Sequence, residues 1–87
     1  MKLKLKGSEA AAGTSSTNGS NVGSATLVRV HNSGTAERLV SLETSANVLI
    51  GTFTLQGGGT EYLEKDPTDE IFAAHAEILL LAVAYYS

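Results

Sequence analysis

The side chains that could perform chemistry are few, and their spacing matches no catalytic or metal-binding motif. The chain has no cysteine and two histidines, His31 and His75, which lie far apart and not at the short spacings of zinc ligands. We expect His31 on a strand and His75 in a loop, with no metal between them. Serine and threonine are abundant, but no GxSxG sequence provides the strained turn of a hydrolase nucleophile. The sequence therefore predicts no enzyme, no bound metal and no cofactor.

Residues 57–60, Gly-Gly-Gly-Thr, superficially resemble a phosphate-binding loop. The Lys-Ser/Thr pair that such loops need does not follow, and neither does a helix pattern, so a hairpin turn is favoured. Four carboxylates close in sequence could collect a calcium ion: Glu64, Asp66, Asp69 and Glu70. Their spacing matches no EF-hand loop, and we favour a solvated acidic turn. Lys65 either pins the turn at Pro67 or forms an ion pair, within the chain or between subunits.

The charge of the chain limits the class of partner. Net charge is −3, and three of the six basic residues are Lys2, Lys4 and Lys6, so three basic residues face nine carboxylates in the rest of the chain. That acidic body argues against a nucleic-acid partner. The basic start has no apolar stretch behind it, so we expect no secretion signal. The most apolar run, residues 78–86, is far shorter than the ~20 residues of a membrane-spanning helix, so we expect no membrane partner.

Composition divides the chain of 87 residues into two parts. Residues 1–24 begin with alternating Lys and apolar residues, which predicts a short strand, and continue as a low-complexity run of small polar residues from about residue 7. We interpret residues 1–24 as an N-terminal strand or arm with a flexible linker. Residues 25–87 contain the apolar runs and form the predicted domain.

Short apolar runs separated by turn signals predict an antiparallel all-β domain. We expect residues 25–31 and 38–43 to form one hairpin across the turn at residues 32–34. A second hairpin is expected between residues 48–55 and 60–65, across the glycines at 57–59. Leu49, Phe53 and Leu55 would share one face of its first strand, and Gly51 would mark a bulge or a close approach.

The C-terminal third fits two local structures. Asp66 and Pro67 could begin a helix over residues 67–84, but that helix would be apolar on nearly every side from Ile78. We favour a turn at 66–69, a short extended or irregular piece at 70–74 and a final strand at 77–86. This strand is apolar on both faces, so one face belongs to the core and the other must be covered by the arm or by another subunit.

The predicted core is small for an unaided chain, which points to a partner surface. About 63 residues remain after the arm, with no cysteine for a disulfide, and domains of this size usually need an additional source of stability. We expect homo-oligomers, a trimer among the candidate states. The candidate interface residues are Leu3, Leu5, Phe53, Leu79, Leu81, Val83, Tyr85 and Tyr86.

Residues 50–65, 66–74 and 81–85 carry a resemblance to a known group of proteins. Their order of strand, glycine turn, strand ending in Lys, Pro-Thr-Asp turn and closing Val-Ala-Tyr resembles small virion structural proteins of tailed bacteriophages, including cyanophage-type ones. The resemblance implies a small antiparallel β-sandwich. It also implies a capsid decoration (cement) protein that binds the major capsid protein or another virion protein. The extended N-terminal arm that we expect before this β-sandwich follows from composition and is not part of the resemblance.

The expected location is thus the virion, with the capsid surface favoured, and the host cytoplasm during assembly. A neck, tail or fibre component remains an alternative within the same family. A receptor- or glycan-binding module is an alternative of a different class, and it would favour aromatic side chains grouped on loops.

Overall fold

The computed structural model describes residues 2–86, with the side chain of Tyr86 outside the described part. The strands in this part are β1 (Lys2–Leu5), β2 (Ala10–Ala11), β3 (Leu27–Asn32), β4 (Arg38–Glu43), β5 (Leu49–Leu55), β6 (Thr60–Glu64), β7 (Glu70–Ala73) and β8 (Ile78–Tyr86). A single-turn 3-10 helix, η1 (Ser16–Asn18), lies between β2 and β3. The all-β prediction is confirmed, and the helix alternative for residues 67–84 is wrong.

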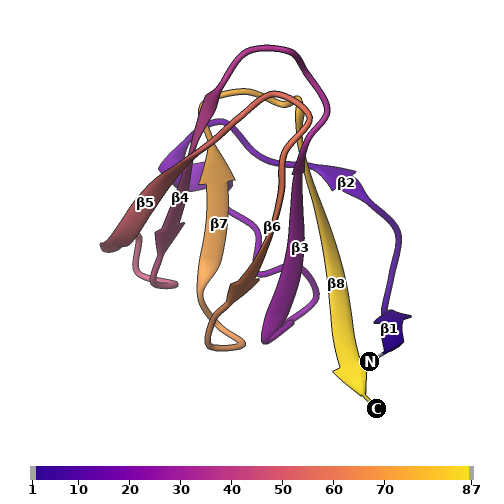
Figure 1. Ribbon diagram of the computed structural model, residues 1–87. Helices are drawn as coiled ribbons and strands as arrows, with labels where there is room; N and C mark the ends of the chain where they lie inside the picture. Colours follow the sequence, from indigo (N-terminus) through magenta and orange to yellow (C-terminus); the bar gives the residue numbers. More distant parts are fainter. Residues whose placement is uncertain (1, 87) are drawn as a thin grey trace.

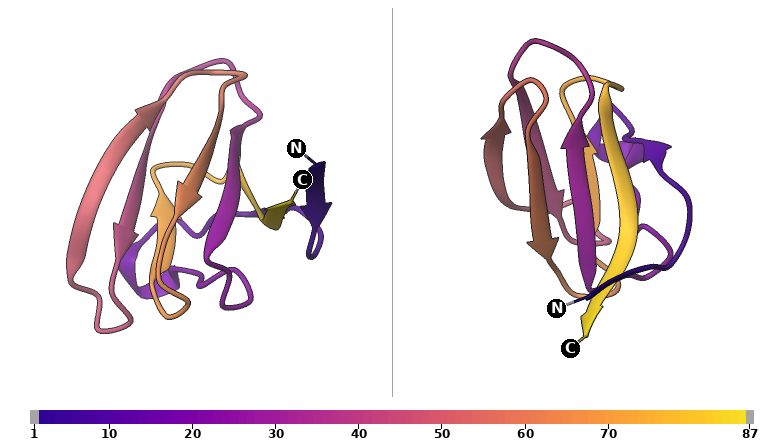
Figure 2. Two further views of the ribbon diagram at one scale, coloured as in Figure 1. Left: turned by 60° about the horizontal axis from the view of Figure 1, so that its bottom comes forward. Right: turned by 45° about the vertical axis from the view of Figure 1, so that its right-hand side comes forward.

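The strands form two antiparallel sheets that share one hydrophobic core. The larger sheet has the order β1-β8-β3-β6, with β2 also paired to β8, and the smaller sheet has the order β5-β4-β7. Figure 1 labels all eight strands, and the left view of Figure 2 places β4 and β5 on one side and β3, β8 and β1 on the other. The core draws on both sheets, with Val28 and Val30 from β3, Val40 from β4, Ile71 from β7 and Leu80 from β8.

Both predicted hairpins are wrong, although most of their strands are correctly placed. β3 pairs with β6 and β8, and β4 pairs with β5 and β7, so residues 25–31 and 38–43 belong to different sheets. The same holds for residues 48–55 and 60–65. Between β3 and β8, every connection except the one from β4 to β5 crosses from one sheet to the other.

Asn32 explains the first crossing. It was expected in a tight turn, but it ends β3 and is fully buried. Its side-chain Nδ2 donates hydrogen bonds to the carbonyl oxygens of Ala36 at 2.8 Å and Leu55 at 2.9 Å, and its Oδ1 accepts one from the N–H of Gly34. These bonds satisfy a buried amide and attach the loop after β3 to the end of β5 in the other sheet.

The hairpin between β4 and β5 contains no glycine. Thr44 Oγ1 accepts hydrogen bonds from the N–H groups of Ala46 and Val48, and Asn47 adopts a left-handed conformation with φ of 66°. Asparagine tolerates this conformation better than other residues with a side chain. Of the two roles predicted for Gly51, the structure supports the bulge, because the β4–β5 register shifts between the pairs Leu42–Gly51 and Glu43–Leu49. It gives no close approach, because no atom lies within 4 Å of the place where a Cβ on Gly51 would stand.

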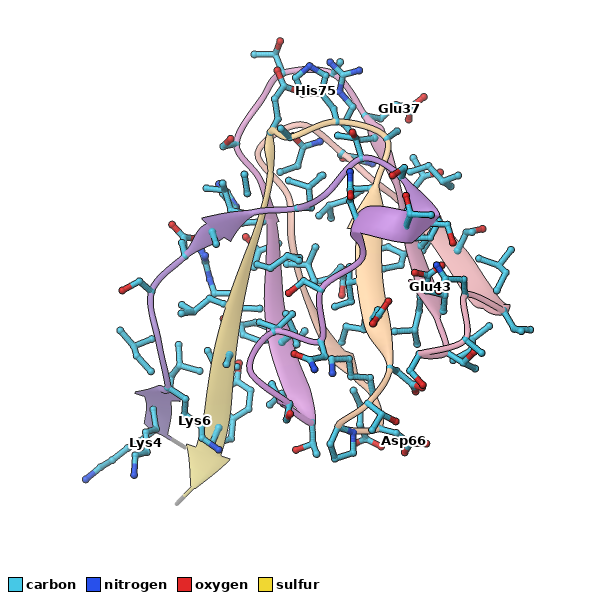
Figure 3. The ribbon with its side chains drawn as sticks, turned by 180° about the vertical axis from the view of Figure 1, so that it is seen from behind. Lys4, Lys6, Glu37, Glu43, Asp66 and His75 are labelled. Carbon is cyan, nitrogen blue, oxygen red and sulfur yellow. The ribbon has the colours of Figure 1, made fainter. Side chains whose placement is uncertain are left out.

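Residues 2–24 pack along the sheets and do not form a separate extended arm. β1 and β2 pair with the free edge of β8, and the N–H of Ala12 donates to the carbonyl of Ile78. The segment then crosses to β7, where Ser20 and Ile71 exchange two backbone hydrogen bonds of 3.0 and 2.8 Å. Figure 3, seen from behind, shows this path across the molecule. Backbone bonding to two strand edges compensates for the shortage of apolar side chains in this segment.

A glycine substitution tests whether this segment belongs to the fold. A Cβ at Gly13 would collide with the backbone oxygen of Asn18, whereas a Cβ at Gly51 would meet open space. We expect Gly13→Ala to lower the free energy of unfolding by about 1–3 kcal/mol, as overpacking does, and Gly51→Ala to change it little. Chemical denaturation followed by circular dichroism measures both. Equal stability of the two variants would contradict the packed position of the segment.

Candidate interaction surface

One face of β8 packs into the core, and the other points away from it. Ile78 and Leu80 point into the core, so the alternation of a strand directs Leu79, Leu81, Val83 and Tyr85 to the opposite face. Residues that are directly paired in an antiparallel ladder project on the same face. The pairing therefore adds neighbours from three strands, and we call the whole set the outer face: Leu3, Leu5, Arg29, His31, Tyr62, Leu79, Leu81, Val83 and Tyr85.

Six of the eight predicted interface residues lie on the outer face. They are Leu3, Leu5, Leu79, Leu81, Val83 and Tyr85. Phe53 does not belong to it: this side chain is half-buried on β5, packs against the core and lines an apolar pocket with Leu63 of β6. The side chain of Tyr86 lies outside the described part of the chain.

The N-terminal segment already covers part of the second apolar face of β8. Leu81 and Val83 are 6% and 3% exposed although they stand outside the core cluster. β1 places Leu5 beside Val83, and Leu3 and Leu5 line a shallow hollow with Leu81. The covering residues are themselves exposed, Leu3 by 41% and Leu5 by 62%. The apolar surface is thus extended along the sheet onto β1 and not removed.

Polar groups border one side of the hollow. Arg29 Nη1 donates a hydrogen bond of 2.8 Å to Glu9 Oε2, in an ion pair that is partly exposed and so contributes little to stability. His31 Nδ1 lies 2.8 Å from Thr60 Oγ1. The surface therefore combines an apolar floor with a polar rim, which is the general anatomy of protein interfaces.

Two tyrosines stand at the other end of the outer face. The rings of Tyr62 on β6 and Tyr85 on β8 meet edge to face, with centroids 5.3 Å apart, and both residues are exposed, by 42% and 37%. A hydrogen bond with Tyr62 is the main cause that raises the pKa of the Tyr85 hydroxyl above 10, with smaller contributions from burial and from the charge of Tyr62. Arg29 acts in the opposite direction.

Lys65 pins the acidic turn, one of its two expected roles. Its Nζ donates to the carbonyl oxygens of Asp66 at 3.1 Å and Pro67 at 3.5 Å, and the side chain is buried. Burial lowers the pKa of Lys65, and the charges of Asp69 and Asp66 partly counter this effect. The predicted turn at residues 66–69 is confirmed by the hydrogen bond from the N–H of Asp69 to the carbonyl of Asp66.

The expected positions of the histidines are confirmed, with His31 on β3 and His75 in the loop before β8. Within residues 2–86, no three side chains of His, Cys, Asp or Glu gather in one group. No helix in this part of the chain is long and apolar enough to cross a membrane.

Sequence reasoning did not include Arg29, His31, Tyr62 and the rim residue Glu9 in this surface. Alternation along β3 does place Arg29 and His31 opposite the buried Val28 and Val30, so their outward direction was available from the sequence. Their neighbours depend on the register between strands that lie far apart in the chain. No protein-family model, curated protein or solved structure matches the chain.

The tyrosine pair predicts a specific titration. Tyr62→Phe removes the hydroxyl that raises the pKa of Tyr85, so the pKa of Tyr85 should move back toward 10. Since the folded-state pKa is raised, the contribution of the neutral hydroxyl to stability is present below pH ~10 and is lost as the pH rises through the folded-state pKa.

Tyrosinate absorbance against pH measures this shift. The titration of Tyr85 is isolated by subtracting Tyr85→Phe from the unmodified chain, and the double variant from Tyr62→Phe. An unchanged Tyr85 titration in the Tyr62→Phe background would contradict the interaction.

Proposed function

We propose that this chain is a non-enzymatic virion structural protein, a capsid decoration protein that binds and stabilises a capsid lattice. The observation that carries the proposal is the outer face, where β1, β6 and β8 bring exposed Leu3, Leu5, Tyr62 and Tyr85 onto one side of a sheet. Contiguous apolar patches on small domains mark interaction sites, and tyrosine and arginine are enriched in them.

The composition of the surface favours a protein partner. Leucine and tyrosine side chains supply contact area, while Arg29 and Glu9 at the rim supply polar contacts. The bacteriophage resemblance supports the major capsid protein, or another virion protein, as the specific partner. Tyr62 and Tyr85 lie on strands and not on loops, so the aromatic pattern gives less support to a glycan-binding module.

A second apolar group supports homo-oligomers. Val48, in the turn before the edge strand β5, is exposed by 61%, and Leu49 and Ile50 at the start of β5 are exposed by 58% and 52%. β5 belongs to the smaller sheet, whereas the outer face belongs to the larger one. Two separate apolar groups would let one copy of the chain contact another copy through the smaller sheet while the outer face binds the shell.

A matched pair of variants tests the outer face. Leu3 and Leu39 are exposed by 41% and 44%, and Leu39 lies on β4 of the smaller sheet. We expect Leu3→Asp to weaken binding to capsids assembled without this chain by about tenfold or more. The reason is that a charge would replace an apolar side chain that the complex with the capsid would bury. Leu39→Asp should bind like the unmodified chain.

Co-sedimentation of labelled protein with such capsids gives the affinities, and thermal unfolding confirms that both variants fold. Copies per particle distinguish a decoration protein, present in hundreds, from a neck, tail or fibre component, present in few. A stable monomer that fails to bind these capsids would contradict the proposal.

A further inference from the structure

A buried carboxylate ends β4 without a full set of partners. Glu43 is 1% exposed, and its Oε1 accepts a hydrogen bond from the Ser16 hydroxyl of η1. Its other oxygen, Oε2, has no hydrogen-bond partner among the described residues. An ionised carboxylate is expensive to bury unless another charge or several donors compensate it. Figure 3 labels Glu43 beside η1.

A second carboxylate stands next to it. Glu70 is the direct cross-strand partner of Glu43 in the β4–β7 ladder, and it is half-buried. Like charges in directly opposite positions destabilise a sheet. The ion pairs within residues 2–86 involve Glu9 and Glu77, and none includes Glu43 or Glu70. The described side chains therefore supply no opposite charge to this pair of acids, and the Ser16 hydroxyl reaches only one oxygen of Glu43.

Both carboxylates border one small space. A Cβ built on Gly19 would lie 2.6 Å from Glu43 Oε2 and 3.1 Å from Glu70 Oε1. Glycine at this position thus keeps free a space onto which the unpartnered oxygen and an oxygen of the neighbouring acid converge. The space is formed by three parts of the chain: the segment after η1, the end of β4 and the start of β7.

We propose that Glu43 and Glu70, with the hydroxyl of Ser16, bind a hard divalent cation such as Ca²⁺ or Mg²⁺. Carboxylate and hydroxyl oxygens are the ligands that these ions prefer, and the half-buried side of Glu70 allows water to complete the coordination. The ion would neutralise the buried charge. It would also fasten the N-terminal segment, through Ser16, to both β4 and β7.

Thermal unfolding at neutral pH tests the site. Metal-free protein is compared in CaCl2 alone, in MgCl2 alone and in KCl of equal ionic strength. We expect at least one divalent ion to raise the unfolding temperature saturably, by roughly 5 °C or more, beyond the effect of KCl. Glu43→Gln and Glu70→Gln should lose this response. Glu61→Gln, at an exposed position on β6, should keep it.

Two outcomes would overturn the proposal. One is a divalent effect no larger than that of KCl, which would exclude a bound divalent ion as the compensation for the two acids. The other is a rise in unfolding temperature in Glu43→Gln and Glu70→Gln as large as in the unmodified chain, which would place the ion elsewhere. If Glu43→Gln does not fold, the unmodified chain and Glu70→Gln are titrated with CaCl2 or MgCl2 in a calorimeter. Saturable binding to the unmodified chain but not to Glu70→Gln supports the site, and equal binding to both contradicts it.

Discussion

The structure depends on one strand that is apolar on both faces. β8 directs Ile78 and Leu80 into the core shared by the two sheets, and Leu81 and Val83 to the opposite side. Both sets of side chains need cover, and both edges of the strand need hydrogen-bond partners. β3 satisfies one edge, and β1 and β2 satisfy the other. The position of the N-terminal segment follows from this requirement.

The composition of that segment suits a path between strand edges. Small residues, among them Ala12 and Gly13, let its backbone approach β8 and β7 closely enough for hydrogen bonds to Ile78 and Ala73. A low-complexity sequence would be disordered if it had to fix its own shape. Here two preformed edges supply the partners, so the segment is ordered by the backbone and not by apolar side chains.

The sequence was informative about strands and poorly informative about their pairing. Residues 38–43 form the strand that was predicted, and the acidic turn at 66–69 lies where Pro67 indicated. Local turn signals favoured hairpins, but the buried side chain of Asn32 directs the chain to the other sheet. A buried asparagine and a turn asparagine look alike in a sequence, since only the tertiary contacts separate them.

The same limit applies to the candidate surface. An apolar second face on residues 77–86 predicted Leu79, Leu81, Val83 and Tyr85 together, because alternation along one strand is local information. Arg29 and Tyr62 join them only through the register of β3 with β6 and β8, which no local pattern specifies. The outer face was thus predictable where it follows one strand and not where it crosses between strands.

Cover supplied by the chain itself shapes the surface that remains for a partner. β1 continues the sheet at the edge of β8 and places Leu5 beside the buried Val83, while Leu3 and Leu5 themselves are exposed. Because paired residues project on the same face, Leu3 and Leu5 share the face of Tyr85 and Val83, whereas Lys4, which is paired with Ala84, projects on the opposite face. Since Leu3 and Leu5 stand beside the outer face of β8 and remain exposed, the apolar surface that is left for a partner continues onto β1.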